Sequence, residues 1–187
     1  MCIRDRPNTS DFKQLGKALA QLHQVKHASF GWQQHNFIGS LSQTNNQHPN
    51  WLDFYIAERL LPQFQLAQQK QLLSSQEIPS KNSLLEKGNS LFKDIQPTLL
   101  HGDLWSGNFL IATDGTPYLI DPAVYYGHGE VDIAMTRLFG GFSTDFYKAY
   151  YEFHPPKTDL TIRQDWYQLY YLPVSYTHLT LPTILLV

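Results

Sequence analysis

A histidine-to-asparagine motif followed by a predicted hairpin is the feature that most constrains the fold of this chain. The motif and the two apolar runs that come after it occupy residues 101–108, 108–112 and 118–120. Asp114 and Gly115 separate the two runs. An Asp-Gly pair between apolar runs favours a tight hairpin turn, because glycine tolerates a positive φ. The sequence therefore predicts a loop that carries Asp103, followed by a hairpin that ends at Asp121.

The predicted hairpin brings Asn108 and Asp121 close together, because it returns the chain antiparallel to itself. Both residues then offer oxygen atoms, which are the ligands that Mg²⁺ prefers. Asp103 lies on the loop just before them, where a carboxylate can serve as the base for a substrate hydroxyl. A base, an asparagine five residues later and a second aspartate after a strand are what phosphoryl transfer from a nucleotide requires. We therefore predict a kinase-type active site that uses ATP and Mg²⁺.

Two other interpretations of these three residues are open. Each residue alone is more often an ordinary turn residue, because Asp and Asn side chains hydrogen-bond to the backbone in loops. Their joint spacing, with a hairpin of the right length between them, reverses that preference. The second alternative is a kinase-shaped binding module without catalysis, and the presence of Asp103, Asn108 and Asp121 together argues against it.

The stretches HGDLWSGNFLI and YLIDPAVYYGHGEVDIAM resemble the fructosamine kinase (ketosamine-3-kinase) family, a branch of the aminoglycoside-phosphotransferase-like kinases. The resemblance extends over roughly residues 10–172 and is strongest over 99–135. It implies ATP-dependent phosphorylation of a sugar hydroxyl on a fructosamine-type adduct, either small or protein-bound, as a step in deglycation. The Asp-Pro-Ala triplet at 121–123 departs from the Asp-Phe-Gly of protein kinases in the way that this family does.

Related kinases that act on aminoglycosides, choline or homoserine are the alternative within enzymes. They share the three catalytic residues, so those residues do not discriminate between the branches. The Trp-Ser-Gly insertion at 105–107 and the Phe-Gly-Trp segment at 30–32 favour the fructosamine branch.

The resemblance also implies a role for individual residues. Asp103 matches the catalytic base, and Asn108 and Asp121 match the magnesium ligands. Trp105 resembles a substrate-facing aromatic residue that stacks on the apolar face of a sugar ring. Plain packing of its large side chain at the base of the loop is an equally weighted alternative.

Two further residues are expected to support the predicted catalytic loop. We expect His101 to orient the loop through hydrogen bonds of its ring nitrogens, not to transfer a proton. Asp132 opens an amphipathic run, where a carboxylate meets the partially positive start of a helix. The family pattern suggests that Asp132 also braces the loop. His23, a lone histidine on the first predicted helix, is expected to be a packing residue.

Composition limits the class of protein and its partners. The chain has 187 residues with 42% hydrophobic and 14% aromatic content, which favours one packed domain over disorder. A net charge of −2 offers no electrostatic footprint for nucleic acid. No apolar run reaches the length of about 18 residues that suggests a membrane helix. Cys2 is the single cysteine, which favours a reducing, cytoplasmic location. The oligomeric state stays open.

The order of predicted elements indicates a mainly helical α+β fold. Apolar periodicity predicts a first helix that begins near Ser10, with Ser10 as its N-cap, and a second helix from Asn50 that Pro62 kinks or restarts. Further helices are predicted over 82–93, 131–139, 144–153 and 160–171. Residues 27–49 are polar and predicted to be irregular. Helices on both sides of a catalytic hairpin are what the C-terminal lobe of a protein-kinase-like fold requires.

The two ends of the chain interrupt this pattern. Residues 1–6 and 174–187 resemble translated adaptor sequence, so we expect the kinase-like lobe to occupy 7–173; a native tail is the alternative. The glycines before residue 101 are scattered and form no phosphate-covering loop. The first hundred residues are already assigned to helices and loops of the lobe. We therefore expect the chain to lack a nucleotide-binding lobe and to be inactive alone.

Overall fold

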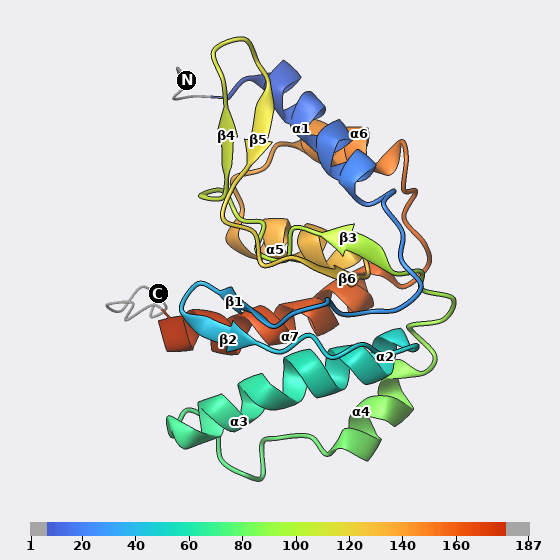
Figure 1. The fold of residues 1–187 in the computed structure, drawn as a ribbon, viewed down its shortest axis with the longest axis vertical. Helices are drawn as coiled ribbons and strands as arrows, with labels where there is room; N and C mark the ends of the chain where they lie inside the picture. Colours follow the sequence, from blue (N-terminus) through green and yellow to red (C-terminus); the bar gives the residue numbers. More distant parts are fainter. Residues whose placement is uncertain (1–6, 179–187) are drawn as a thin grey trace.

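The computed structural model describes residues 7–178, which form an α+β fold dominated by helices (Figure 1). In chain order the helices are α1 (Thr9–Leu22), α2 (Trp51–Phe54), the π-helix η1 (Tyr55–Leu60), α3 (Leu61–Gln69), α4 (Lys81–Gly88), α5 (Glu130–Phe139), α6 (Thr144–Tyr151) and α7 (Leu160–His178). The strands pair as antiparallel ladders: β1 (Asn36–Ile38) with β2 (Leu41–Gln43), β3 (Thr98–Leu100) with β6 (Tyr125–Gly127), and β4 (Phe109–Ile111) with β5 (Pro117–Leu119). The predicted α+β class and the predicted hairpin are both confirmed.

Helix α1 begins earlier than the sequence suggested. Its N-cap is Asn8, whose side-chain oxygen accepts a hydrogen bond from the backbone N–H of Asp11 at 3.1 Å. The Asp11 carboxylate accepts from the backbone N–H of Asn8 at 2.8 Å, which closes a capping box. The prediction that Ser10 caps this helix was therefore wrong by two residues. The apolar face of α1, with Leu15 and Leu19 fully buried, is as expected.

The helix that follows Asn50 changes its winding along its length. Asn50 caps α2, the chain then forms η1, and Pro62 lies in the first turn of α3, so the predicted restart at Pro62 is confirmed. Arg59 of η1 is fully buried. Its guanidinium carbon lies 4.8 Å from the ring centroid of Phe54 and 4.0 Å from that of Tyr125, a cation–π arrangement that fixes η1 against β6.

Other expectations need correction. The segment 27–49 is not wholly irregular, since it contains the β1–β2 ladder. The helix predicted over 82–93 ends at Gly88, where a Cβ atom would lie 2.5 Å from the Leu52 side chain. Helix α7 runs to His178 and crosses the predicted boundary between 173 and 174. Residues 1–6 and 179–187 lie outside the described residues, so the predicted domain limits stay predictions.

Two apolar clusters meet along α5. One joins α1, α6 and the β4–β5 hairpin, which lie together at one end of the molecule in Figure 1. The other joins α2, α3, α4 and α7 at the opposite end. Helix α5 contributes Ile133 to the first cluster and Val131 to the second. The loop 101–108 joins β3 to β4 beside this helix, and its Leu104 is buried in the first cluster. No described helix is both long enough and apolar enough to cross a membrane.

Candidate active site

The backbone of the 101–108 loop is held by one buried carboxylate from α5. Asp132 is 0% exposed, and its Oδ2 accepts the backbone N–H of His101 at 2.8 Å. Its Oδ1 accepts the backbone N–H of Gly102, also at 2.8 Å. Burial acts to raise the pKa of Asp132, but a hydrogen bond from His23, the nearby His23 and His101 rings and the Gly102 N–H outweigh it and lower this pKa. The carboxylate therefore stays ionised and fixes the start of the loop.

The His101 ring links the loop to the strand that precedes Asp121. Its Nδ1 lies 3.3 Å from the backbone nitrogen of Asp103 and accepts that N–H, and its Nε2 lies 2.8 Å from the carbonyl oxygen of Ile120. With these partners, Nδ1 accepts a hydrogen bond and Nε2 donates one. The backbone N–H of Ala123 donates to the His101 carbonyl at 2.8 Å. The ring therefore orients backbone on both sides of the site.

Asp103 and Asn108 are brought into direct contact. The side-chain Nδ2 of Asn108 donates to the backbone carbonyl of Asp103 at 2.8 Å and lies 3.2 Å from its Oδ2. Asn108 is 6% exposed, whereas Asp103 is half-buried. Because Nδ2 faces Asp103, the amide oxygen of Asn108 points away from it.

Asp121 lies beside this pair at the base of the hairpin. The backbone N–H of Ile120 donates to the Asn108 carbonyl at 3.0 Å. Asp121 is the next residue in the chain after Ile120, so its backbone starts beside Asn108. Asp121 is exposed and has a φ of +50°, a left-handed conformation that is uncommon outside glycine. Such backbone strain gathers at functional sites, because the surrounding structure must hold it.

The donors at this site suit a hard cation. The Asn108 amide oxygen and the Asp121 carboxylate are oxygen ligands, and Mg²⁺ is commonly held by one or two carboxylates together with substrate phosphates. Groups of three or more His, Cys, Asp or Glu side chains that could hold a metal ion are absent from the described residues. The site therefore fits an ion that shares its coordination with a phosphate, as in phosphoryl transfer, better than a closed structural metal centre.

Trp105 projects from the outer side of the loop. Its side chain is 42% exposed, and a Cβ atom on Gly107 would lie 2.5 Å from the indole ring. The indole therefore lies across Gly107 and stays partly exposed. A Cβ atom on Gly141, whose φ is +86°, would likewise overlap the Ser106 side chain. The loop after α5 thus borders the Trp105 side of the site.

Sequence reasoning missed the residues that support Asp132 and the 101–108 loop. The Nε2 of His23 lies 3.0 Å from Asp132 Oδ2, and its Nδ1 lies 2.8 Å from the hydroxyl of Tyr150. The Tyr171 hydroxyl donates to the Gly102 carbonyl at 3.1 Å. These contacts join residues 69 to 127 positions apart, and no local spacing signals them.

Gly102 gives the loop a testable local requirement. Its φ is +83°, and a Cβ atom there would overlap the carbonyl oxygen of Ala123. We expect Gly102→Ala to lower the free energy of unfolding by about 3 kcal/mol, from left-handed strain and steric overlap together. Gly115 is the matched control, since its φ is +91° but a Cβ atom there would lie no closer than 3.3 Å to any atom beyond its chain neighbours. We expect Gly115→Ala to lose only about 1–2 kcal/mol. Urea unfolding that gave equal losses would remove the steric part of this explanation.

Comparison with known proteins gives a consistent result. The fructosamine kinase family model matches residues 3–180. A probable ketoamine kinase from Lactiplantibacillus plantarum is 43% identical over 160 residues, which cover 84% of this chain and 57% of the relative. The ketosamine-3-kinase of Mus musculus is 34% identical and covers 88% of this chain, with 53% of its own length matched. The chain thus spans just over half the length of these curated relatives.

Solved structures agree with the sequence comparison. The crystal structure of a candidate fructosamine-3-kinase from Thermobifida fusca superposes with a TM-score of 0.86 at 31% identity, over 95% of this chain and 62% of that one. The choline kinase LicA from Streptococcus pneumoniae, at 15% identity and a TM-score of 0.50, covers 97% of this chain and 61% of its own, and shares the kinase-like fold alone. With a family model that spans nearly its whole length and relatives about 40% identical, the chain belongs to the fructosamine kinase family.

Proposed function

We propose that the protein carrying this chain phosphorylates a sugar hydroxyl of ketosamine adducts, with ATP as the phosphate donor. The observation that carries the proposal is the contact between Asp103 and Asn108, in a loop whose backbone is fixed by buried Asp132. Membership of the fructosamine kinase family supports the choice of substrate class. The deglycation of amines or proteins would be the consequence.

Each residue of the site has a role in this proposal. Asp103 accepts the proton of the substrate hydroxyl while the hydroxyl oxygen forms a bond to the γ-phosphorus of ATP. The bond between the γ-phosphorus and the oxygen that bridges to the β-phosphate breaks in the same step, and ADP leaves. Asn108 and Asp121 would hold Mg²⁺, which would offset the charge of the phosphate groups. The hydrogen bond from Nδ2 to Asp103 supports this role for Asn108, since it leaves the amide oxygen for the ion.

Substrate selection is assigned to the outer side of the loop. Trp105 keeps 42% of its side chain exposed, so an indole face can stack on the apolar face of a sugar ring. His101 and Asp132 are not assigned to chemistry, because all their described contacts hold backbone or His23. They support the loop.

The wider organisation of the protein is part of the same proposal. We assign residues 7–173 to the C-terminal lobe of a kinase-like fold, and the order of helices before and after the β4–β5 hairpin supports this assignment. The cytoplasmic location rests on Cys2 as the single cysteine of the sequence. A choline-type kinase is the second candidate, favoured by the fold shared with LicA.

A side-by-side turnover assay tests the substrate class. The assay should compare two proteins. The first is the 187-residue chain. The second, which we call the extended enzyme, is a fusion of this chain to the part of the Lactiplantibacillus plantarum relative that the chain does not match. We expect the extended enzyme to phosphorylate fructosyl-lysine faster than choline or an aminoglycoside, because Trp105 suits a sugar ring. Faster turnover of choline would move the protein to the second candidate.

A further inference from the structure

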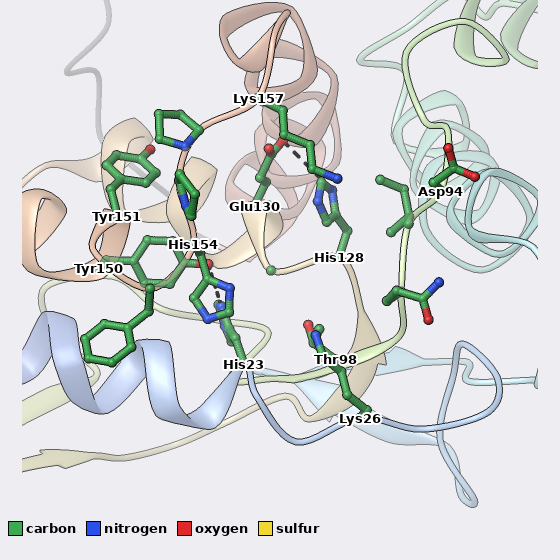
Figure 2. Close-up of a pocket in the computed structure, with 16 residues that line it drawn as sticks. His23, Lys26, Asp94, Thr98, His128, Glu130, Tyr150, Tyr151, His154 and Lys157 are labelled. Atoms are coloured by element: carbon green, nitrogen blue, oxygen red, sulfur yellow. Dashed lines mark hydrogen bonds and ion pairs between the residues drawn. The ribbon is translucent and has the colours of Figure 1, made fainter.

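A buried chain of side chains connects α6 and α1 to the 101–108 loop. The Tyr150 hydroxyl of α6 lies 2.8 Å from Nδ1 of His23, which follows α1, and Figure 2 shows the two side chains meeting. Nε2 of His23 lies 3.0 Å from Asp132 Oδ2. The exposed fractions of Tyr150, His23 and Asp132 are 3%, 1% and 0%. All three side chains are therefore almost fully buried.

His23 donates to the same carboxylate oxygen that holds the loop. Asp132 Oδ2 accepts both the backbone N–H of His101 and the His23 ring, while Oδ1 accepts the N–H of Gly102. Three donors on its two oxygens restrict the orientation of the carboxylate. Without His23 the carboxylate could rotate about its Cβ–Cγ bond, and the two backbone bonds of the loop would lengthen or alternate. The His23 hydrogen bond also helps to lower the pKa of Asp132, so it favours the ionised form that both amides need.

We propose that His23 is a positioning residue for phosphoryl transfer, acting through Asp132 on the loop that carries Asp103. This inference rests on the proposed function for its kinetic part. The catalytic loop would then be aligned by the α1–α6 pair as well as by α5. A rigid link of this kind matters because misplacing a reacting group by about 1 Å can cost about 100-fold in rate.

The surroundings of His23 favour this role over simple packing. Both of its ring nitrogens have polar partners, as a buried histidine requires, and the partner of Nε2 is the same carboxylate that accepts the backbone N–H groups of the loop. A Cβ atom on Gly129 would lie 2.7 Å from Nδ1 of His23 and 3.0 Å from the Tyr150 hydroxyl, so a glycine stands where the ring needs space. A pocket of about 290 Å³ borders the ring, and His23 and Tyr150 are among its lining residues (Figure 2). Gly129 also lines it.

His154 provides a matched control beside the same ring. Its centroid lies 6.1 Å from that of His23, and it stacks on Tyr150 at 5.1 Å. Its Nε2 lies 2.9 Å from the Ala20 carbonyl oxygen, and none of its described hydrogen bonds reaches Asp132. Loss of His154 therefore disturbs the local packing without removing a donor to Asp132.

Hydrogen–deuterium exchange on the 187-residue chain tests the brace without any need for activity. We expect His23→Leu to speed exchange of the amides of His101 and Gly102 at least about 10-fold, because the carboxylate that accepts them becomes mobile. His23→Gln keeps an amide donor near the position of Nε2 and should leave exchange within about 3-fold of the parent. His154→Gln should also leave it within that range. Equal protection in His23→Leu and the parent would overturn the inference, and far-ultraviolet circular dichroism identifies any variant that does not fold.

Kinetics of the extended enzyme test the functional consequence. We expect His23→Leu to lower kcat about 10- to 100-fold while the KM for ATP changes less than about 3-fold, since a positioning residue acts on the loop and not on nucleotide binding. His23→Gln and His154→Gln should retain most of the turnover. In His23→Ala, free imidazole should restore part of kcat, because the pocket beside the ring leads to the vacated space.

The outcomes separate this inference from the proposed function. If the parent extended enzyme phosphorylates no ketosamine, the proposed function fails, while the exchange experiment still decides whether His23 braces the loop. If the parent is active and His23→Leu is as active as His154→Gln, the positioning role is wrong. Imidazole that fails to rescue a folded His23→Ala variant would likewise count against it.

Discussion

Asp103→Asn is expected to lower kcat of the extended enzyme on fructosyl-lysine by a factor on the order of 10² to 10⁴, the usual contribution of a positioned general base. The amide that replaces the carboxylate has no basic oxygen for the substrate proton. The neighbouring contacts should survive, because Asn108 Nδ2 still donates to the backbone carbonyl of residue 103 at the 2.8 Å seen now. Nucleotide affinity should change much less than kcat.

Asp114→Asn is the matched control for this measurement. Asp114 is an exposed aspartate at the opposite end of the β4–β5 hairpin, where its carboxylate accepts the backbone N–H of Thr116 at 2.9 Å. An asparagine oxygen can accept the same bond, so both fold and turnover should be retained. Near-full turnover of Asp103→Asn, with Asp114→Asn unchanged, would refute the base role and leave a non-catalytic binding module as the better interpretation.

The parts of the molecule that sequence predicted well are local. Asp103 and Asn108 are five residues apart, and the hairpin after them is set by a turn at Asp114 and Gly115. Gly115 has a φ of +91°, the conformation for which a glycine was needed. Helices α5, α6 and α7 likewise begin where apolar periodicity placed them, within one residue.

The parts that sequence did not predict depend on distant partners. Strands β3 and β6 pair residues 98–100 with residues 125–127, on either side of the 101–108 loop and the β4–β5 hairpin. Strands β1 and β2 are three residues each, too short to show alternation. The cap of α1 was misplaced because Asn8 pairs with an aspartate, whereas the usual capping box has Glu or Gln at that position.

The support of the candidate site shows the same limit. Asp132 was expected to brace the loop only through the family resemblance, and the helix-start argument alone gave it no partner. His23 lies 109 residues from Asp132, and a histidine near a helix end carries no signal of a buried carboxylate. Sequence therefore locates the residues proposed for chemistry, whereas the residues that hold them in place emerge only from the packing of α1, α5 and α6.

Asp132→Asn is expected to lower the free energy of unfolding of the 187-residue chain by about 3 kcal/mol. The carboxylate now accepts the N–H groups of His101 and Gly102 through separate oxygens, both at 2.8 Å. An asparagine offers one oxygen and one NH₂ group, so at least one of these buried N–H groups would face another donor. Urea unfolding measures the loss, and Asp53→Asn is the control, because that aspartate is exposed on α2 and should change stability by less than about 0.5 kcal/mol.

The loss on Asp132→Asn should depend on pH in a defined direction. The pKa of Asp132 is lowered in the folded chain, despite the burial that opposes this, by its hydrogen bonds and by the His23 and His101 rings. A carboxylate with a depressed pKa contributes its full stability above its unfolded pKa of about 3.9 and loses it as the pH falls toward the folded value. The difference between parent and variant should therefore be constant from pH 7 to about pH 5 and shrink below about pH 4. A difference that instead grew on acidification would mean that the native carboxyl is protonated, and that the loop is held by some other acceptor.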